Sequence, residues 1–73
     1  MDIKLQFGMR IKYLREKKGW SQEKLSLYSG VNKNYICDLE NGRRNPTLEV
    51  MDRLAIGLGI TLSELLKGLM SFN

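Results

Sequence analysis

The stretch of residues 21–41, SQEKLSLYSGVNKNYICDLEN, constrains the fold of this 73-residue chain more than any other. Ser21 can cap a helix, because its hydroxyl accepts the backbone N–H groups that the first turn leaves unpaired. Gly30 can end that helix, since glycine tolerates the left-handed conformation found at many helix ends. Asn32 can then cap a second helix. The stretch therefore predicts two short helices joined by a tight turn.

The second of these helices has two unlike faces. Ile36 and Leu39 are three residues apart, so they share the side that packs into a core. At about 100° per residue, the opposite side collects polar and small residues; these are Lys33, Asn34, Cys37 and Asn41, with Asp38 at the edge. This helix is predicted to offer hydrogen-bond donors and acceptors to a partner.

Helical spacing extends over the rest of the chain and predicts one all-α domain of five helices, residues 1–73. The first helix, from about Ile3 to Lys18, turns Phe7, Ile11 and Leu14 toward the core. Thr47 caps a fourth helix after the loop NGRRNPT. A last helix is predicted over about residues 61–71, with Thr61 and Glu64 as a capping box and apolar residues Leu62, Leu65, Leu66 and Leu69.

The first helix also carries a second apolar stripe, formed by Leu5, Met9 and Tyr13 at intervals of four residues. This stripe allows two interpretations. It packs against the C-terminal helix of the same chain, or part of it belongs to a subunit interface.

Composition narrows the classes of function. The net charge of +4 favours an anionic partner, nucleic acid first. The chain has no histidine and one cysteine, so we expect no catalytic residue, no metal site and no cofactor. Cys37 is either a small residue facing the partner or a redox sensor. No apolar run reaches the length of a membrane span and no signal peptide is visible, so we expect a cytoplasmic protein.

The motif resembles the helix-turn-helix of the lambdoid phage repressor and Cro family, also called the xenobiotic-response-element family. Gln22, Gly30, Val31, Ile36 and Leu39 carry the likeness within the motif. The flanking segments RIKYLREKKGWSQEKL and YICDLENGRRNPTLEVMDRLAIGLGITLSELL extend it over nearly the whole chain. The sequence is similar to small stand-alone members such as restriction–modification controller proteins. Serine replaces the usual alanine at Ser26, and its small side chain still permits close helix packing.

The resemblance implies a role in binding double-stranded DNA for the second motif helix. Base contacts carry over to Lys33 and Asn34 and, one turn later, to Asp38, with Cys37 able to touch a thymine methyl. Lysine suits guanine and asparagine suits adenine in the major groove. Phosphate contacts are implied for residues around the groove: Gln22, Asn41, Arg43, Arg44, Asn45 and Thr47. An internal ion pair between Arg15 and Glu40 is also implied.

Assembly is expected to involve the end of the chain, which is rich in leucine. Ile56, Leu66, Leu69, Met70 and Phe72 are the candidates for a two-fold interface, and the resemblance also implies a homodimer on a palindromic operator. The alternative is that these residues close the core of the monomer. The overall interpretation is a transcriptional regulator of prokaryotic or phage type. Its rivals are an antitoxin paired with a toxin, and a protein-interaction module that has lost DNA binding.

Overall fold

The computed structural model describes residues 2–69. Five helices follow one another: α1 (Ile3–Lys17), α2 (Gln22–Ser29), α3 (Lys33–Glu40), α4 (Leu48–Leu58) and α5 (Leu62–Leu65). These residues contain no strand. The predicted all-α fold of five helices is therefore confirmed.

Polar side chains begin four of the helices as the sequence predicted. Ser21, Asn32, Thr47 and Thr61 each accept a backbone N–H from two or three residues further along the chain. Each of these bonds satisfies one donor that has no partner within its helix. Gly30 ends α2 with a φ of 73°, a left-handed conformation that suits glycine. These signals place the turn between α2 and α3.

The helices surround one apolar core. α2 packs on α4, and α1 packs on α3. The largest fully buried side chains come from all five helices: Ile11, Leu25, Ile36, Leu39, Leu54, Leu58 and Leu65. Phe7 is also buried, and Leu14 packs against the core from a half-buried position. The predicted core side of the first helix is thus confirmed.

Two glycines allow neighbouring helices to approach closely. A Cβ atom at Gly8 of α1 would run into the Leu39 carbonyl oxygen and lie 3.0 Å from backbone atoms of Glu40. A Cβ atom at Gly57 of α4 would lie 2.8 Å from the Cα of Ser29 at the end of α2. Both contacts involve backbone, so the neighbour has little freedom to move away. The two glycines therefore fix the distance of α3 from α1 and of α2 from α4.

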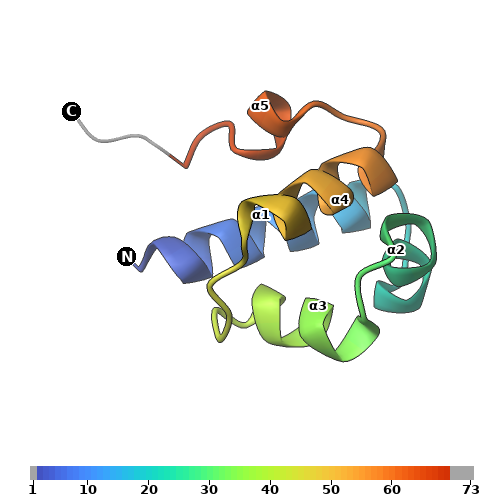
Figure 1. Ribbon diagram of the computed structural model, residues 1–73, viewed down its shortest axis with the longest axis horizontal. Coiled ribbons are helices and arrows are strands. Elements are labelled where there is room, and N and C mark those ends of the chain that lie inside the picture. Colours follow the sequence, from blue (N-terminus) through green and yellow to red (C-terminus); the bar gives the residue numbers. More distant parts are fainter. Residues whose placement is uncertain (1, 70–73) are drawn as a thin grey trace.

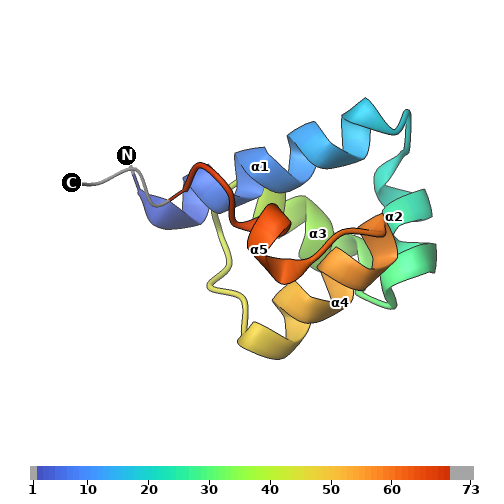
Figure 2. The same ribbon diagram turned by 90° about the horizontal axis from the view of Figure 1, so that it is seen from above.

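α3 and α5 lie on opposite sides of the molecule in Figure 1, and in Figure 2, seen from above, α5 is in front and α3 is behind. α1 and α4 lie between them in Figure 1. The polar side of α3 is consequently remote from α5. No helix within residues 2–69 has the length and apolar character needed to cross a membrane.

The last helix is shorter than predicted. α5 ends at Leu65, and the chain continues in turns in which Lys67 N–H donates to Glu64 and Leu69 N–H donates to Leu66, both at 3.2 Å. Gly68 adopts a φ of 85°, which interrupts helical geometry. The expected helix over residues 61–71 is therefore wrong for residues 66–69, and residues 70 and 71 lie outside the described residues.

The capping box predicted for α5 forms only in part. Thr61 accepts the Glu64 N–H at 3.0 Å, as a cap should. The Glu64 carboxylate, however, lies 3.2 Å from the Arg10 guanidinium of α1. Arg10 also donates to the Glu64 carbonyl at 2.8 Å. Glu64 thus ties α5 to α1.

The second stripe of α1 is only partly covered by the described residues. Met9 and Tyr13 remain 51% and 53% exposed. Leu5 is half-buried, and it lies against the backbone at Gly42 in the loop after α3. Residues 70 and 71 of the expected C-terminal helix lie outside the described residues, so both interpretations of this stripe remain predictions.

Candidate nucleic-acid interface

The outer face of α3 carries the residues predicted to contact bases. Lys33 and Asn34 are exposed in its first turn, while Cys37 and Asp38 are half-buried one turn later. The opposite face is held in the core by Ile36, which has no exposed surface. Since one side of the helix is fixed, the other side is presented in a defined orientation. The structure brings all four predicted residues onto one short helix.

Asp38 lies at the centre of an exposed charge cluster that the sequence did not predict. Its carboxylate lies 3.5 Å from the Arg43 guanidinium and 3.3 Å from the Arg44 guanidinium. The Arg44 guanidinium also lies 4.9 Å above the Tyr35 ring. Both arginines were expected to contact phosphates, and Asp38 was expected to meet a base or a lysine. In this structure without DNA, the carboxylate pairs with both arginines beside the outer face of α3, and the expected contacts to DNA remain predictions.

A backbone turn explains this cluster. Gly42 adopts a φ of 75°, and the Arg43 N–H donates to the Asp38 carbonyl at 2.9 Å. This left-handed glycine folds the chain back over the last turn of α3. The spacing of Asp38 from Arg43 and Arg44 across a glycine was the available signal in the sequence.

Other polar groups around α3 are partly engaged within the chain. The Asn41 amide donates to the Cys37 carbonyl at 2.8 Å. The Lys33 ammonium lies 3.7 Å from the Glu23 carboxylate, and both side chains are largely exposed. Such a surface pair is weak, so the lysine is available to a stronger anionic partner. Asn45 and Thr47 are exposed in the loop before α4. The Thr47 hydroxyl caps α4 by accepting the N–H of Val50 at 3.1 Å.

A buried ion pair holds α3 against α1. The Arg15 guanidinium donates to both oxygens of Glu40, at 2.7 and 2.9 Å, which is the pair that the resemblance implied. Arg15 also donates to the Trp20 carbonyl at 2.7 Å. The hydrogen bonds to Glu40 raise the pKa of Arg15 above its ordinary value, although burial acts against them. The guanidinium therefore stays charged, and the bidentate pair fixes the orientation of the two helices.

Gln22 connects α2 to the same network. Its side-chain amide donates to the Glu40 carboxylate at 3.0 Å. The predicted phosphate-contacting residue is therefore turned partly inward, with its second amide hydrogen left for an outside acceptor. In consequence, one carboxylate on α3 receives donors from both α1 and α2.

The residues predicted to form a dimer interface fall into three groups. Ile56 of α4 is 67% exposed. Leu66 and Leu69 are half-buried and pack against the core of their own chain. Met70 and Phe72 lie outside the described residues. Ile56 is thus the described candidate with the largest exposed fraction.

The polar groups on the α3 side of the molecule define what this face can bind. Within residues 2–69, no three side chains of the metal-ligating types come together. What the α3 side offers is a row of exposed amides and cations on a rigid helix and its following loop. Such groups can meet phosphates and the edges of bases.

Several known proteins are similar to this chain in sequence and in fold. Residues 11–65 match the family model described as Helix-turn-helix. Control protein C.MunI of Mycoplasma sp is 45% identical over 65 residues, which cover 88% of each chain. The crystal structure of the restriction-modification controller protein C.AhdI from Aeromonas hydrophila is 41% identical, with a TM-score of 0.81, and the match covers 88% of this chain and 96% of that one. The wild-type controller protein C.Esp1396I has a TM-score of 0.86 at 26% identity, over 96% and 91% of the two chains.

The family match spans most of the chain and includes both helices of the motif, α2 and α3. The relatives are named as control proteins and regulators. Together with the exposed face of α3, these matches give the identity of the domain. The chain belongs to the helix-turn-helix family, in its phage-repressor-like (xenobiotic-response-element) branch of DNA-binding transcription regulators.

Proposed function

We propose that the protein is a sequence-specific regulator that binds a palindromic operator as a homodimer, with α3 of each copy in the major groove. The observation that carries this proposal is the outer face of α3 with its adjoining loop. Lys33 and Asn34 stand exposed on a helix whose other side is locked in the core. An α-helix fits the major groove, where each base pair displays a distinct pattern of donors and acceptors.

The proposed contacts to DNA are of two kinds, those to base edges and those to phosphates. Lys33, Asn34 and Asp38 meet base edges, and Cys37 touches a thymine methyl. Phosphates are met by the side chains that surround α3: Gln22, Asn41, Arg43, Arg44, Asn45 and Thr47. Phosphate contacts set the register and most of the affinity, whereas base contacts select the sequence.

The ion pairs of Asp38 with Arg43 and Arg44 support a proposal that the two arginines exchange one partner for another when DNA binds. In the free protein, the carboxylate neutralises part of the charge of Arg43 and Arg44. On DNA, the phosphates replace Asp38 as partner, which leaves the carboxylate free to accept from the amino group of a cytosine. Asp38 therefore lowers affinity for DNA that lacks a suitable base at its position.

The biological setting follows from the relatives. The similar proteins C.MunI and C.AhdI are described as a control protein and a restriction-modification controller. We propose the same kind of role for this chain, acting in the cytoplasm of a prokaryotic cell, where its DNA target lies.

Salt-dependent binding to short duplexes tests the proposal. We expect Arg43→Gln to weaken binding to all duplexes alike and to reduce the slope of log K against log [salt] by about one unit. Lys67→Gln is the matched control, because it removes one charge from the segment after α5, opposite α3 (Figure 1). Equal losses for both variants, or no affinity above background for any duplex, would overturn the proposal.

A further inference from the structure

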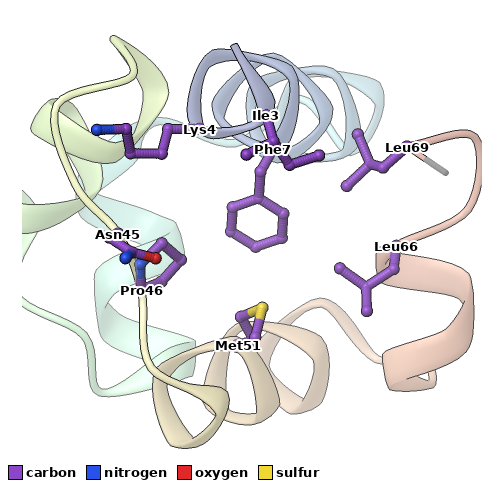
Figure 3. Close-up of a pocket in the computed structure, with 8 residues that line it drawn as sticks. All are labelled: Ile3, Lys4, Phe7, Asn45, Pro46, Met51, Leu66 and Leu69. Atoms are coloured by element: carbon purple, nitrogen blue, oxygen red, sulfur yellow. The ribbon is translucent and has the colours of Figure 1, made fainter.

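The outer side of α2 carries a surface that the proposed function does not use. It lies at the end of the molecule remote from the start of α1 (Figures 1 and 2). A separate apolar pocket, in which Phe7 of α1 points toward Met51 of α4, has Leu66 and Leu69 on one side (Figure 3). Those leucines are already candidates for the dimer interface. The pocket therefore falls within that proposal, whereas the surface on α2 needs its own explanation.

Two aromatic rings, two lysines and a leucine make up this surface. The Trp20 ring stacks on the Tyr28 ring, with 4.8 Å between their centroids and 17° between their planes. The ammonium groups of Lys18 and Lys24 lie 5.1 and 5.9 Å from the centroid of the Trp20 ring. Leu27 follows Lys24 by three residues on the same helix and is 78% exposed, and Tyr28 is 55% exposed. These five residues are called the α2 patch below.

The lysines of the α2 patch are not neutralised by the described part of the chain. Neither Lys18 nor Lys24 forms an ion pair within residues 2–69. Glu23, the acidic residue of α2, instead lies 3.7 Å from the ammonium of Lys33 on α3. The patch thus presents positive charge and exposed apolar area together. Aromatic side chains with a charged rim are typical of surfaces that bind other proteins.

The side of α2 that bears the patch is turned away from α3. Glu23 pairs with Lys33, and the Ser26 hydroxyl donates to a carbonyl of the turn before α3, so these two residues mark the side toward α3. At about 100° per residue, Lys24 and Tyr28 lie roughly 100° or more around the helix from both of them. A partner bound to the patch would therefore leave the outer face of α3 open.

We propose that the α2 patch docks an acidic segment of another protein. Carboxylates of the segment meet Lys18 and Lys24, and one apolar side chain packs on Leu27 and Tyr28. A DNA duplex would supply negative charge, but its backbone offers little apolar surface to the leucine. A second copy of this chain would bring lysine against lysine across a two-fold axis, and like charges repel. An acidic segment with an apolar residue satisfies the charge and the apolar area at once.

The effect on regulation rests on the proposed function, whereas docking of the segment does not. If α3 reads the operator, a protein held on the α2 patch stands beside the DNA without covering the reading helix. The regulator would then bring a second protein to its operator.

Selection from a random library of short peptides tests the docking, on the full chain without DNA. We expect the enriched peptides to combine aspartate or glutamate with a large apolar residue. Each enriched peptide is then titrated while the fluorescence of Trp20 is followed, since this is the only tryptophan of the chain. Binding at the patch should change that fluorescence in a saturable way.

Matched variants locate the site. We expect Leu27→Ser to weaken binding of the enriched peptides by about fivefold, through loss of apolar contact area. Lys24→Gln should weaken binding by about threefold, as expected for one exposed charge. Leu48→Ser and Lys12→Gln are the controls, because they change an exposed leucine of α4 and an exposed lysine of α1 outside the patch. Both controls should bind like the unmodified protein.

Several results would overturn the docking site. They are the absence of enriched peptides, enriched peptides without acidic residues, and equal binding to Leu27→Ser and Leu48→Ser. Loss of a dimer in Leu27→Ser would assign the patch to a second copy. A duplex affinity lowered as much by Lys24→Gln as by Arg43→Gln would assign it to DNA, and either result contradicts the proposal. A protein that binds the peptides but no duplex would count against the proposed function alone.

Discussion

At the scale of single residues, the charged side chains around α3 form one buried network and one exposed cluster. Arg15 and Glu40 are 10% and 4% exposed and make a bidentate pair. The exposed cluster joins Asp38 to Arg43 and Arg44. Burial makes the first network a structural tie whose loss leaves an unpaired charge. Solvent exposure makes the second easy to exchange for an outside partner.

The buried tie leads to a prediction about stability. Glu40→Ala leaves Arg15 without its carboxylate, so we expect it to destabilise the fold by about 3 kcal/mol. Denaturant unfolding of both single variants and the double variant should give a coupling energy well above error. The exposed pair Lys33–Glu23 is the control, and its cycle should give almost none. Additive effects of Arg15→Ala and Glu40→Ala would refute a direct interaction.

Asn34 leads to a prediction about base reading. Its exposed amide in the first turn of α3 can hydrogen-bond to an adenine edge. Asn34→Ala should therefore relax preference at one base position, by about 1–3 kcal/mol. Competition binding with duplexes substituted at each position measures this. An equal loss of affinity for specific and scrambled duplexes would show that Asn34 does not read a base.

At the scale of elements, the sequence predicted the start of every helix but not the end of the last. Ser21, Asn32 and Thr47 act locally, because each cap bonds to its own next residues. The end of α5 depends on tertiary contacts. Leu66 and Leu69 pack against the core from turns that follow α5. The apolar spacing that predicted a longer helix therefore reflects burial of these leucines, which takes place here without helical geometry.

The sequence likewise predicted part of the candidate site and missed another part. The face of α3 follows from helical spacing alone, and the Arg15–Glu40 pair was implied only by the family resemblance. The grouping of Asp38 with Arg43 and Arg44 was missed, because it depends on the backbone path after α3. That path is set by the left-handed conformation of Gly42, and a residue pattern alone does not give its direction.

The contact of α1 with α3 gives a prediction at this scale. Gly→Ala within a helix normally stabilises it by about 1 kcal/mol. At Gly8 the added methyl would meet the backbone of Leu39 and Glu40. We therefore expect Gly8→Ala to be destabilising, by about 1–3 kcal/mol, as overpacked sites are. Thermal unfolding decides the sign, and a stabilised variant would show that the two helices are not held this close.

At the scale of the whole molecule, the proposed DNA contact of one copy depends on a single short helix, α3. Eight residues of helix span about 12 Å, which covers only a few base pairs. Two copies would double the sequence that is read and raise the effective concentration of the second contact. Because α3 and α5 lie at opposite edges, a second copy could dock without covering the α3 face (Figure 1).

Ile56 tests where that second copy docks. This side chain is 67% exposed, so a charge there should leave the fold intact. We expect Ile56→Asp to sediment as a monomer while keeping its helical circular dichroism. Leu48→Asp is a control, since Leu48 is a similarly exposed residue, at 64%, in the same helix. If Ile56→Asp remains a dimer, the interface lies elsewhere, with the exposed Met9 and Tyr13 as the next candidates.

Selection of bound duplexes from a random pool tests the central claim most directly. The measurement is the set of sequences enriched by the unmodified protein at a salt concentration that suppresses non-specific binding. We predict two inverted copies of a short half-site, with centres about 34 Å apart, or one helical turn. A pool that shows no enrichment, or a single half-site without its inverted partner, would contradict a homodimer that reads a palindromic operator through α3.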